Sequence, residues 1–153
     1  MQEHNRKRAI VFGAAAAVWT GVMFFFSGQS GEDSGALSEG LTGVLFGWLI
    51  RRGVSAERVE FFVRKGAHMG GFALMGFLLG MSMLSALKRR AAAAVTVCAC
   101  AAAAVLNELH QMLAEGRHCS VADMGIDFAG AALGLLAAVV VLHAFSSKKY
   151  YDR

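Results

Sequence analysis

Charge is scarce in this sequence. Charged side chains make up 17% of the 153 residues, whereas soluble domains usually carry about a quarter. Proline is absent, glycine is abundant at 18 residues, and the mean hydropathy is +0.50. Because four long apolar stretches account for this composition, it favours an integral membrane protein over a soluble domain.

Cysteine is also scarce, with three residues in the chain. Cys98 and Cys100 are two apart in an apolar stretch that we expect to be helical, so they point to different faces and cannot bridge each other. Cys119 stands alone. These spacings match neither a disulfide framework nor a zinc site, and we predict no metal and no cofactor.

The common catalytic motifs are missing as well. "ELHQ" is not the His-Glu-x-x-His pattern of zinc proteases, no Gly-rich phosphate loop precedes a helix, and no Gly-x-Ser-x-Gly elbow occurs. The sequence therefore leaves open whether the protein is an enzyme and does not favour it. We expect membrane lipid around the protein and no nucleic-acid partner.

Four segments are long and apolar enough to cross a hydrocarbon core of ~30 Å, which needs about 20 helical residues. The first follows the basic run "NRKR" as in a signal peptide, but it exceeds the usual apolar length of roughly 7–15 residues and lacks a clean cleavage site. We therefore expect an uncleaved first span and an all-α bundle of four transmembrane helices, forming a single domain over residues 1–153. The predicted spans are residues 9–26, 66–87, 91–113 and 121–145.

The connection between the first two spans, residues 27–65, changes character along its length. It begins polar and flexible in "SGQSGEDSGALSEG" and then turns apolar in "LTGVLFGWLI", which is too short to span. The stretch "RRGVSAERVEFFVRK" then mixes apolar and charged residues, as interfacial segments do. We expect a short interfacial or re-entrant helix within this connection.

Basic residues indicate the orientation, because Lys and Arg near span ends concentrate on the cytoplasmic side. With both termini in the cytoplasm, that side receives Arg6, Lys7, Arg8, Lys88, Arg89, Arg90, Lys148, Lys149 and Arg153. The remaining basic residues face outward, against the usual bias, and need another explanation: Arg51, Arg52, Arg58, Arg64, Lys65 and Arg117.

Small residues predict where the spans pack together. Glycines separated by three residues let a neighbouring backbone approach closely. Such pairs occur at Gly66 and Gly70, Gly76 and Gly80, and Gly130 and Gly134. We expect all three pairs to pack within one bundle.

Polar residues gather at the outward ends of three spans. Glu108 lies about 25 Å along its helix from Ala91, still inside a hydrocarbon layer of roughly 30 Å. A carboxylate facing lipid there is unfavourable by a few kcal/mol, so Glu108 should face the bundle and have a partner. The candidate cluster comprises Arg64, Lys65, His68, Glu108, Gln111, Arg117, Asp123 and Asp127, with loop contacts from Ser27, Gln29 and Ser30.

Two interpretations of this cluster stay open. Ion pairs between the helix ends would tie the bundle together, whereas intramembrane ionisable groups commonly mark functional sites. His68, Glu108 and Asp123 have the chemistry to ligate a metal or to act as acid and base, but their spacing specifies neither role.

At these residues the sequence resembles the VanZ-like family. The resemblance begins with the Ser-rich element "FFSGQSGEDSGALSEG" after the first span and continues with the Arg-Lys-x-x-His element in "VRKGAH". An acidic-x-x-Gln, Gly-Arg, Ser-x-x-Asp and Gly-x3-Gly series follows, carried by Glu108, Gln111, Gly116, Arg117, Ser120, Asp123, Gly130 and Gly134. The resemblance implies a small multi-pass protein of the bacterial plasma membrane, in a family whose founding member is associated with low-level resistance to the glycopeptide teicoplanin.

Three functions are consistent with these observations. The first is binding of an anionic head group, from a lipid-linked envelope precursor or a lipoglycopeptide, because guanidinium and ammonium groups match phosphate. The second is a structural or partner-binding role for the ion-paired helix ends. The third is an enzyme acting on an envelope lipid, with Glu108 or Asp123 as acid or base and His68 assisting.

Overall fold

The computed structural model describes residues 3–151, apart from the side chains of His4 and of residues 145–151. All regular structure in this part of the chain is helical, with no strand. The five helices are α1 (Glu3–Ser27), α2 (Gly31–Arg51), α3 (Ala56–Ala86), α4 (Arg89–Gln111) and α5 (Val121–Tyr151). The predicted all-α fold is confirmed.

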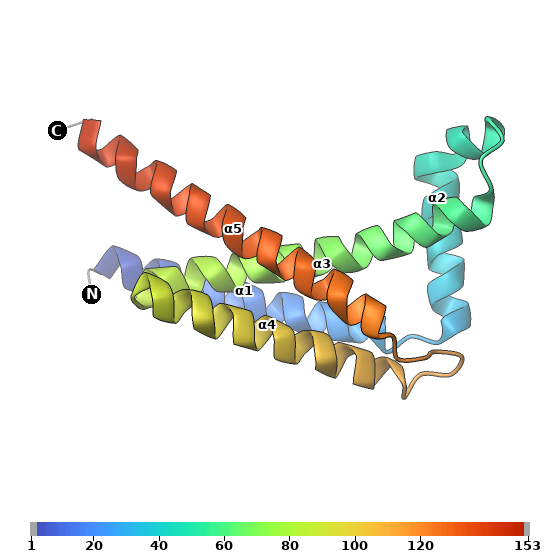
Figure 1. The fold of residues 1–153 in the computed structure, drawn as a ribbon, viewed down its shortest axis with the longest axis horizontal. Coiled ribbons are helices and arrows are strands. Elements are labelled where there is room, and N and C mark those ends of the chain that lie inside the picture. The colour runs from blue at the N-terminus through green and yellow to red at the C-terminus, as the bar shows by residue number, and fades with distance from the viewer. Residues whose placement is uncertain (1–2, 152–153) are drawn as a thin grey trace.

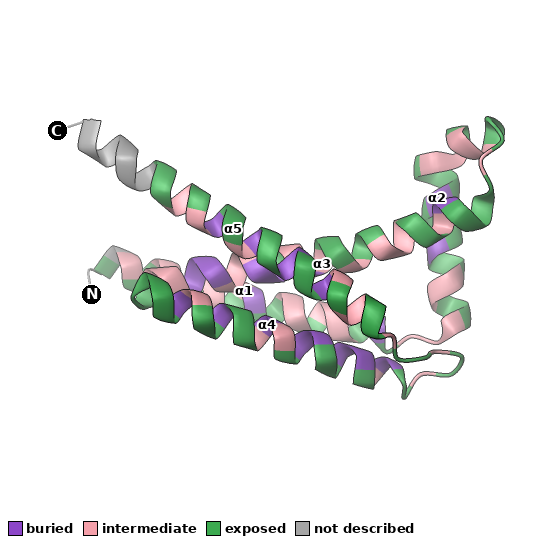
Figure 2. Ribbon diagram, viewed as in Figure 1, coloured by how far each residue is buried: buried purple, intermediate pink, exposed green. Residues whose placement is uncertain are grey.

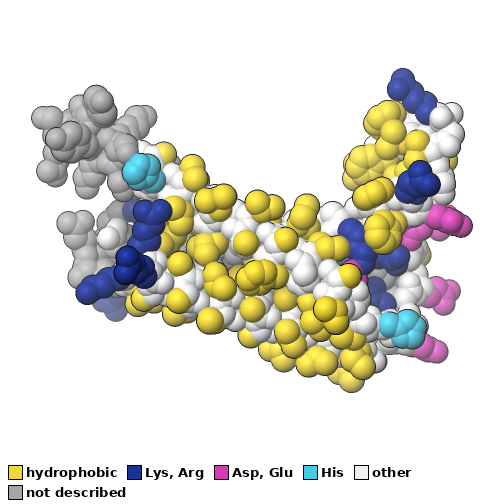
Figure 3. Space-filling view, viewed as in Figure 1, with side chains coloured by type: hydrophobic (Ala, Val, Ile, Leu, Met, Phe, Trp, Pro, Cys, Tyr) yellow, Lys and Arg dark blue, Asp and Glu magenta, His cyan; other side chains and the backbone are white. Residues whose placement is uncertain are grey.

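Four of these helices are long and apolar enough to cross a membrane, as predicted. The spanning segments are Asn5–Ser27, Ala56–Ala86, Arg89–Gln111 and Val121–Ala144. Apolar side chains cover the length of the bundle between two charged ends (Figure 3). Lys and Arg gather at the end that holds the N-terminus, where Arg6, Lys7, Lys88, Arg89 and Arg90 are exposed, and the opposite end carries both signs of charge. The side chains of Lys148 and Lys149, and Arg153, lie outside the described residues.

The connection after α1 differs from the prediction. Where we expected a flexible stretch and a short helix, α2 is a helix of 21 residues that lies across the end of the bundle (Figure 1). Ser30 caps this helix by accepting the N–H of Asp33 at 3.1 Å, and the acidic first turn suits the positive end of the helix dipole. The Ser and Asp residues that suggested a loop therefore start a helix, so the prediction of a short helix was wrong.

The second span also begins earlier than predicted. The mixed apolar and charged stretch expected at the interface forms the first turns of α3, which starts at Ala56 rather than residue 66. A short turn separates α2 from α3, and Gly53 adopts a positive φ of 90° there. Residues other than glycine rarely adopt this conformation, which ends many helices. After this turn, α3 carries Arg58 exposed and Arg64 and Lys65 partly buried.

α3 is the central helix and contacts each of the other four. Buried residues lie on the inner sides of α3, α4 and α5 (Figure 2). The core consists mostly of small side chains around two larger ones: Phe72, Met75, Cys100, Ala103, Ala104 and Ala131. Trp19 of α1 packs against this core and donates a hydrogen bond of 2.8 Å to the carbonyl of Gly71.

The closest helix contact is between α3 and α5. A Cβ at Gly130 would collide with the carbonyl of Met69, and a Cβ at Gly134 with that of Ala73. On the other helix, a Cβ at Gly76 would collide with the backbone of Ala131. The predicted packing role of these glycines is confirmed, and Gly80 faces side chains of α5.

Gly66 and Gly70 behave differently, because nothing lies within 4 Å of an added Cβ at either position. The prediction that this pair packs within the bundle was wrong. These two glycines lie on a face of α3 that is exposed, one turned away from α5. Spacing alone identifies a small-residue pair but not the face on which the neighbouring helix lies.

Replacing Gly134 by Ala should force α3 and α5 apart, because the new methyl group meets backbone and not a flexible side chain. Such overpacking typically costs about 1–3 kcal/mol. We expect a lower melting temperature of the detergent-purified protein, followed by fluorescence-detected size exclusion after heating. Gly70→Ala, on the same pair of helices but in open space, is the matched control and should melt like the wild type. Equal melting of the two variants would contradict the packing described here.

Candidate functional site

Glu108 points into the bundle because it continues the buried face of α4. Ala92, Thr96, Cys100 and Ala104 recur at the helical repeat and are all buried. Glu108 follows one turn after Ala104 and is 0% exposed. The buried face is thus apolar along most of α4 and turns polar at its end, where Asn107 and Gln111 are buried too.

One oxygen of the Glu108 carboxylate has a partner and the other has none. Oε2 accepts the backbone N–H of Ser120 at 2.8 Å, which links the end of α4 to the start of α5. Oε1 is buried without a hydrogen-bond partner. Ser120 also caps α5, since its hydroxyl accepts the N–H of Asp123 at 3.2 Å. The hydrogen bond from Ser120 N–H therefore holds the Glu108 carboxylate at the N-terminal end of α5.

Two acids of α5 pair with a lysine and a histidine of α3. Asp123 forms an ion pair with Lys65, and Asp127 Oδ1 lies 3.2 Å from His68 Nδ1. Lys65 and His68 are three residues apart and Asp123 and Asp127 four apart, so each helix presents its pair on one face. Asp127 is 0% exposed, and its second oxygen, Oδ2, is buried without a partner.

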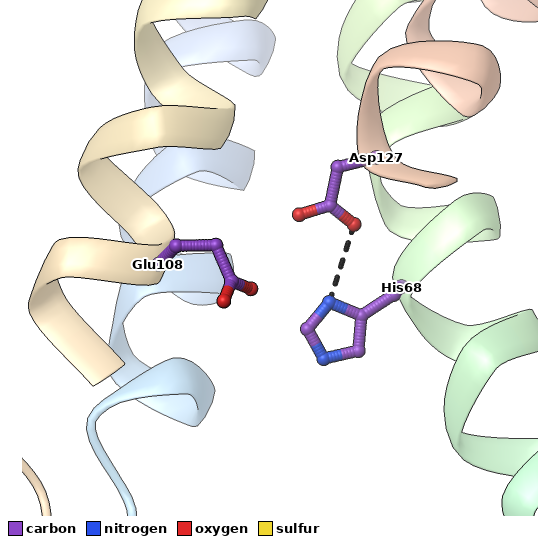
Figure 4. A group of neighbouring side chains, drawn as sticks. All are labelled: His68, Glu108 and Asp127. Atoms are coloured by element: carbon purple, nitrogen blue, oxygen red, sulfur yellow. Dashed lines mark hydrogen bonds and ion pairs between the residues drawn. The ribbon is translucent and has the colours of Figure 1, made fainter. Parts of the chain in front are cut away.

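His68, Glu108 and Asp127 come together from three helices (Figure 4). Each offers one ligand-type atom, and these atoms all lie within 4.8 Å of one another. The sequence had suggested Asp123 as the third member of this group. The structure brings in Asp127 instead, because Asp127 lies one helical turn deeper on α5 and Asp123 is engaged by Lys65.

Arg117 binds neutral oxygens and no carboxylate. One guanidinium nitrogen donates to Ser34 Oγ at 2.8 Å, and another donates to Gln111 Oε1 at 2.7 Å. Burial lowers the pKa of Arg117, and the nearby positive charge of Arg64 lowers it further. Arginine nevertheless stays protonated in proteins, so Arg117 brings a positive charge between α2 and α4.

Arg64 is partly buried on α3, and among the described residues it has no hydrogen-bond or ion-pair partner. Of the basic candidates, Lys65 and His68 contact carboxylates, whereas Arg64 and Arg117 do not. The two arginines therefore place, on the same side of the site, positive charge that no carboxylate of the described residues contacts directly.

The loop candidates have separate roles in the structure. Ser27 is buried and donates a long hydrogen bond of 3.4 Å to the carbonyl of Asn107. Ser30 is used to cap α2 and also donates to Asp33 Oδ2 at 2.7 Å. Sequence analysis did not include Ser34 among the candidates, although it belongs to the same Ser-rich element and receives Arg117.

A cavity of about 370 Å³ opens between α1, α2 and α3. Its polar part is formed by Arg64, His68, Arg117 and Ser34, with Ser27, Gln29 and Asn107. Its apolar wall includes Trp19, Val22, Met23, Phe26, Leu37 and Leu41. No carboxylate belongs to the cavity lining formed by the described residues. The cavity has a size typical of small-molecule sites, with walls that are apolar and a polar part that is cationic.

Arg117→Lys should loosen the contact of α2 with the bundle. A lysine ammonium cannot reproduce the fork that reaches Ser34 and Gln111 together. We expect faster amide hydrogen exchange in residues 31–51, measured by mass spectrometry in detergent, with exchange in the core of α4 unchanged. Arg51→Lys, at the exposed end of α2, is the control. Unaltered exchange in Arg117→Lys would mean that other contacts, such as the hydrogen bond from Gly31 N–H to the Glu115 carbonyl at 2.8 Å, suffice to hold α2.

The comparison with protein families gives a match over most of the chain. The model of the VanZ/LLP1 family matches residues 12–142, which include every residue of the polar cluster and most or all of each span. Neither a curated protein nor a solved structure matches the chain. The protein that brings three polar helix ends together in this way belongs to the VanZ/LLP1 family.

Proposed function

We propose that this protein binds an anionic amphiphile, with the head group on Arg64 and Arg117 and the apolar part along α1 and α2. The observation that carries the proposal is a cavity with two partly buried guanidinium groups and no carboxylate in its described lining. Ligands with this chemistry include a lipid-linked envelope precursor and a lipoglycopeptide.

The positive charge of the cavity supports an anionic head group. Burial lowers the pKa of Arg117 most and the positive charge of Arg64 lowers it further, whereas Glu108 and Asp123 raise it. A phosphate or carboxylate between the two arginines would relieve the repulsion between their charges and accept charge-assisted hydrogen bonds from both. Ser34 and Gln29 line the same region and add neutral hydrogen-bonding groups.

The apolar wall supports a hydrocarbon chain next to that head group. Phe26 and Leu41 line the cavity and are also exposed on the surface of the protein, at 48% and 43%. The cavity wall is therefore continuous with the apolar exterior that faces lipid. A ligand could enter sideways from the bilayer with its head group at the charged end and its chain among the lipids.

The distribution of basic residues and the family support a proposed location and orientation. We propose a multi-pass protein of the bacterial plasma membrane with both termini in the cytoplasm, so that the cavity faces outward. In this position the protein meets envelope precursors and glycopeptides, and binding them is a route by which it would contribute to low-level teicoplanin resistance.

A structural role is the second candidate, and the Lys65–Asp123 ion pair favours it. This pair and the hydrogen bond from Ser120 N–H to Glu108 join the ends of α3, α4 and α5. They would stabilise the bundle as a platform for a partner protein. Arg64, which pairs with none of the described residues, favours ligand binding over this alternative. Ion pairs that only stabilise the helix ends do not require a cation without a partner.

Native cysteines provide a test of the orientation. Cys119 is exposed in the loop between α4 and α5, whereas Cys100 is buried and Cys98 faces outward from the middle of a span. We expect a membrane-impermeant maleimide to label Cys119 in intact cells, and Cys119→Ser to abolish the label. In that background, Lys88→Cys at the opposite end should label only after permeabilisation. The reverse pattern would place the cavity on the cytoplasmic side.

Arg64→Gln should weaken binding of the anionic amphiphile about 10- to 100-fold, which corresponds to one hydrogen bond to a charged group. Binding is measured by equilibrium dialysis of detergent-purified protein against a polyprenyl phosphate, phosphatidylglycerol and teicoplanin in separate arms, with phosphatidylcholine as the zwitterionic comparison. The three anionic arms distinguish the possible sources of the head group.

The matched control for this experiment is Arg58→Gln. Arg58 lies on the same helix but is exposed and outside the cavity lining. Equal affinities of Arg64→Gln, Arg58→Gln and wild type, all monodisperse on size exclusion, would refute the proposed binding and leave the structural role.

A further inference from the structure

We infer that His68, Glu108 and Asp127 form a binding site for one divalent transition-metal ion beside the cavity. The three side chains point toward one another from α3, α4 and α5 (Figure 4), and their ligand-type atoms lie within 4.8 Å. The inference goes beyond the proposed binding of an amphiphile and does not depend on it.

Unsatisfied oxygens in the group point to a missing cation. Glu108 Oε1 and Asp127 Oδ2 are buried without hydrogen-bond partners, and both residues are 0% exposed. Buried polar atoms are almost always paired, because a lost partner costs about 1–3 kcal/mol and more for a charged group. Two such oxygens in one group require a common explanation, and a bound cation satisfies both.

The balance of charge leads to the same conclusion. Lys65 is engaged by Asp123, and Arg117 hydrogen-bonds to Ser34 and Gln111. No ammonium or guanidinium group of the described residues contacts Glu108 or Asp127, and the His68 imidazole contacts Asp127. Two carboxylates and a neutral imidazole carry two negative charges, which a divalent ion neutralises.

The distances allow the three groups to bind one ion after a small adjustment. Ligand atoms about 2.0–2.2 Å from a metal can be at most about 4.4 Å apart, slightly less than the 4.8 Å that bounds this group. The His68 imidazole and the Asp127 carboxylate are already adjacent, with Nδ1 and Oδ1 3.2 Å apart, and a carboxylate that binds an ion through both oxygens also uses Oδ2. A small rotation of the Glu108 carboxylate about Oε2, which Ser120 holds, would bring Oε1 closer to the other two groups.

The donor set indicates the kind of ion. One imidazole nitrogen and two carboxylate oxygens suit Zn²⁺, Mn²⁺, Fe²⁺ or Co²⁺, whereas Ca²⁺ and Mg²⁺ take oxygen ligands almost entirely. Three protein ligands leave further coordination positions open. Because His68 also lines the cavity, water or an oxygen of an anionic ligand in the cavity would be available to complete the coordination.

The test measures metal binding directly. The full chain is purified in detergent with an affinity tag that contains no histidine, stripped with chelator, and titrated with Co²⁺ and Zn²⁺. We expect about one Co²⁺ per chain with visible absorption bands, displacement by Zn²⁺, and a chelator-reversible rise in melting temperature. Glu108→Gln and Asp127→Asn should each weaken Co²⁺ binding by more than about 10-fold, since removing even an outer-shell partner of a metal has an effect of that size.

Two control variants separate this site from its surroundings. Asp123→Asn removes a carboxylate on the same helix that is engaged by Lys65, and it should retain Co²⁺ binding. Arg64→Gln should also retain it, so loss of amphiphile binding and loss of metal binding are distinguishable. Absence of binding to the folded wild type would overturn the inference. Equal loss in Asp123→Asn and Glu108→Gln would overturn it as well, and if the ligand variants fail to fold, the wild-type titration still decides.

Discussion

The close approach of α3 and α5 is the constraint on which the polar site depends. Both helices run in the same direction from the polar rim, which is the end of the bundle where α3 and α5 begin and α4 ends. The absence of side chains at Gly76, Gly130 and Gly134 lets the two backbones come together. Parallel helices in contact meet in the same order along their lengths. Lys65 therefore faces Asp123, and His68 faces Asp127 one turn deeper. A shift of one residue along either helix would rotate these side chains by about 100° and separate both pairs.

The register of α3 and α5 also determines what Glu108 meets. The buried face of α4 consists of small residues, so α4 lies close to the other two helices. Glu108 stands at the end of this face and cannot turn away from the bundle without facing lipid. The Ser120 N–H donates a hydrogen bond to one oxygen of the Glu108 carboxylate. The second oxygen is left facing His68 and Asp127, so the packing that binds the helices together also concentrates negative charge at one point.

The sequence was sufficient to predict the four apolar helices, because hydropathy identifies them, and helical spacing was sufficient to place Lys65 with His68 and Asp123 with Asp127 on one face of each helix. It was not sufficient to predict α2. Ser30, Glu32 and Asp33 are typical of loops by composition, yet their order caps a helix. Nor could it distinguish Asp123 from Asp127 in the group around Glu108, because that choice depends on how far α5 lies along α3, which no single helix determines. Gly66 and Gly70 illustrate the same limit: their spacing was correct for a contact, and the neighbouring helix lies on another face.

The four basic residues of the rim differ in whether they contact a carboxylate, and this difference separates negative from positive groups in the site. Lys65 and His68 are held by carboxylates of α5, whereas Arg117 is held by neutral oxygens and Arg64 by none of the described groups. Negative charge is therefore buried between α3, α4 and α5, and positive charge lines the cavity on the side of α1 and α2. His68 belongs to both regions, with Nδ1 toward Asp127 and its ring in the cavity wall. A cation in the first region and an anion in the second would attract each other across His68.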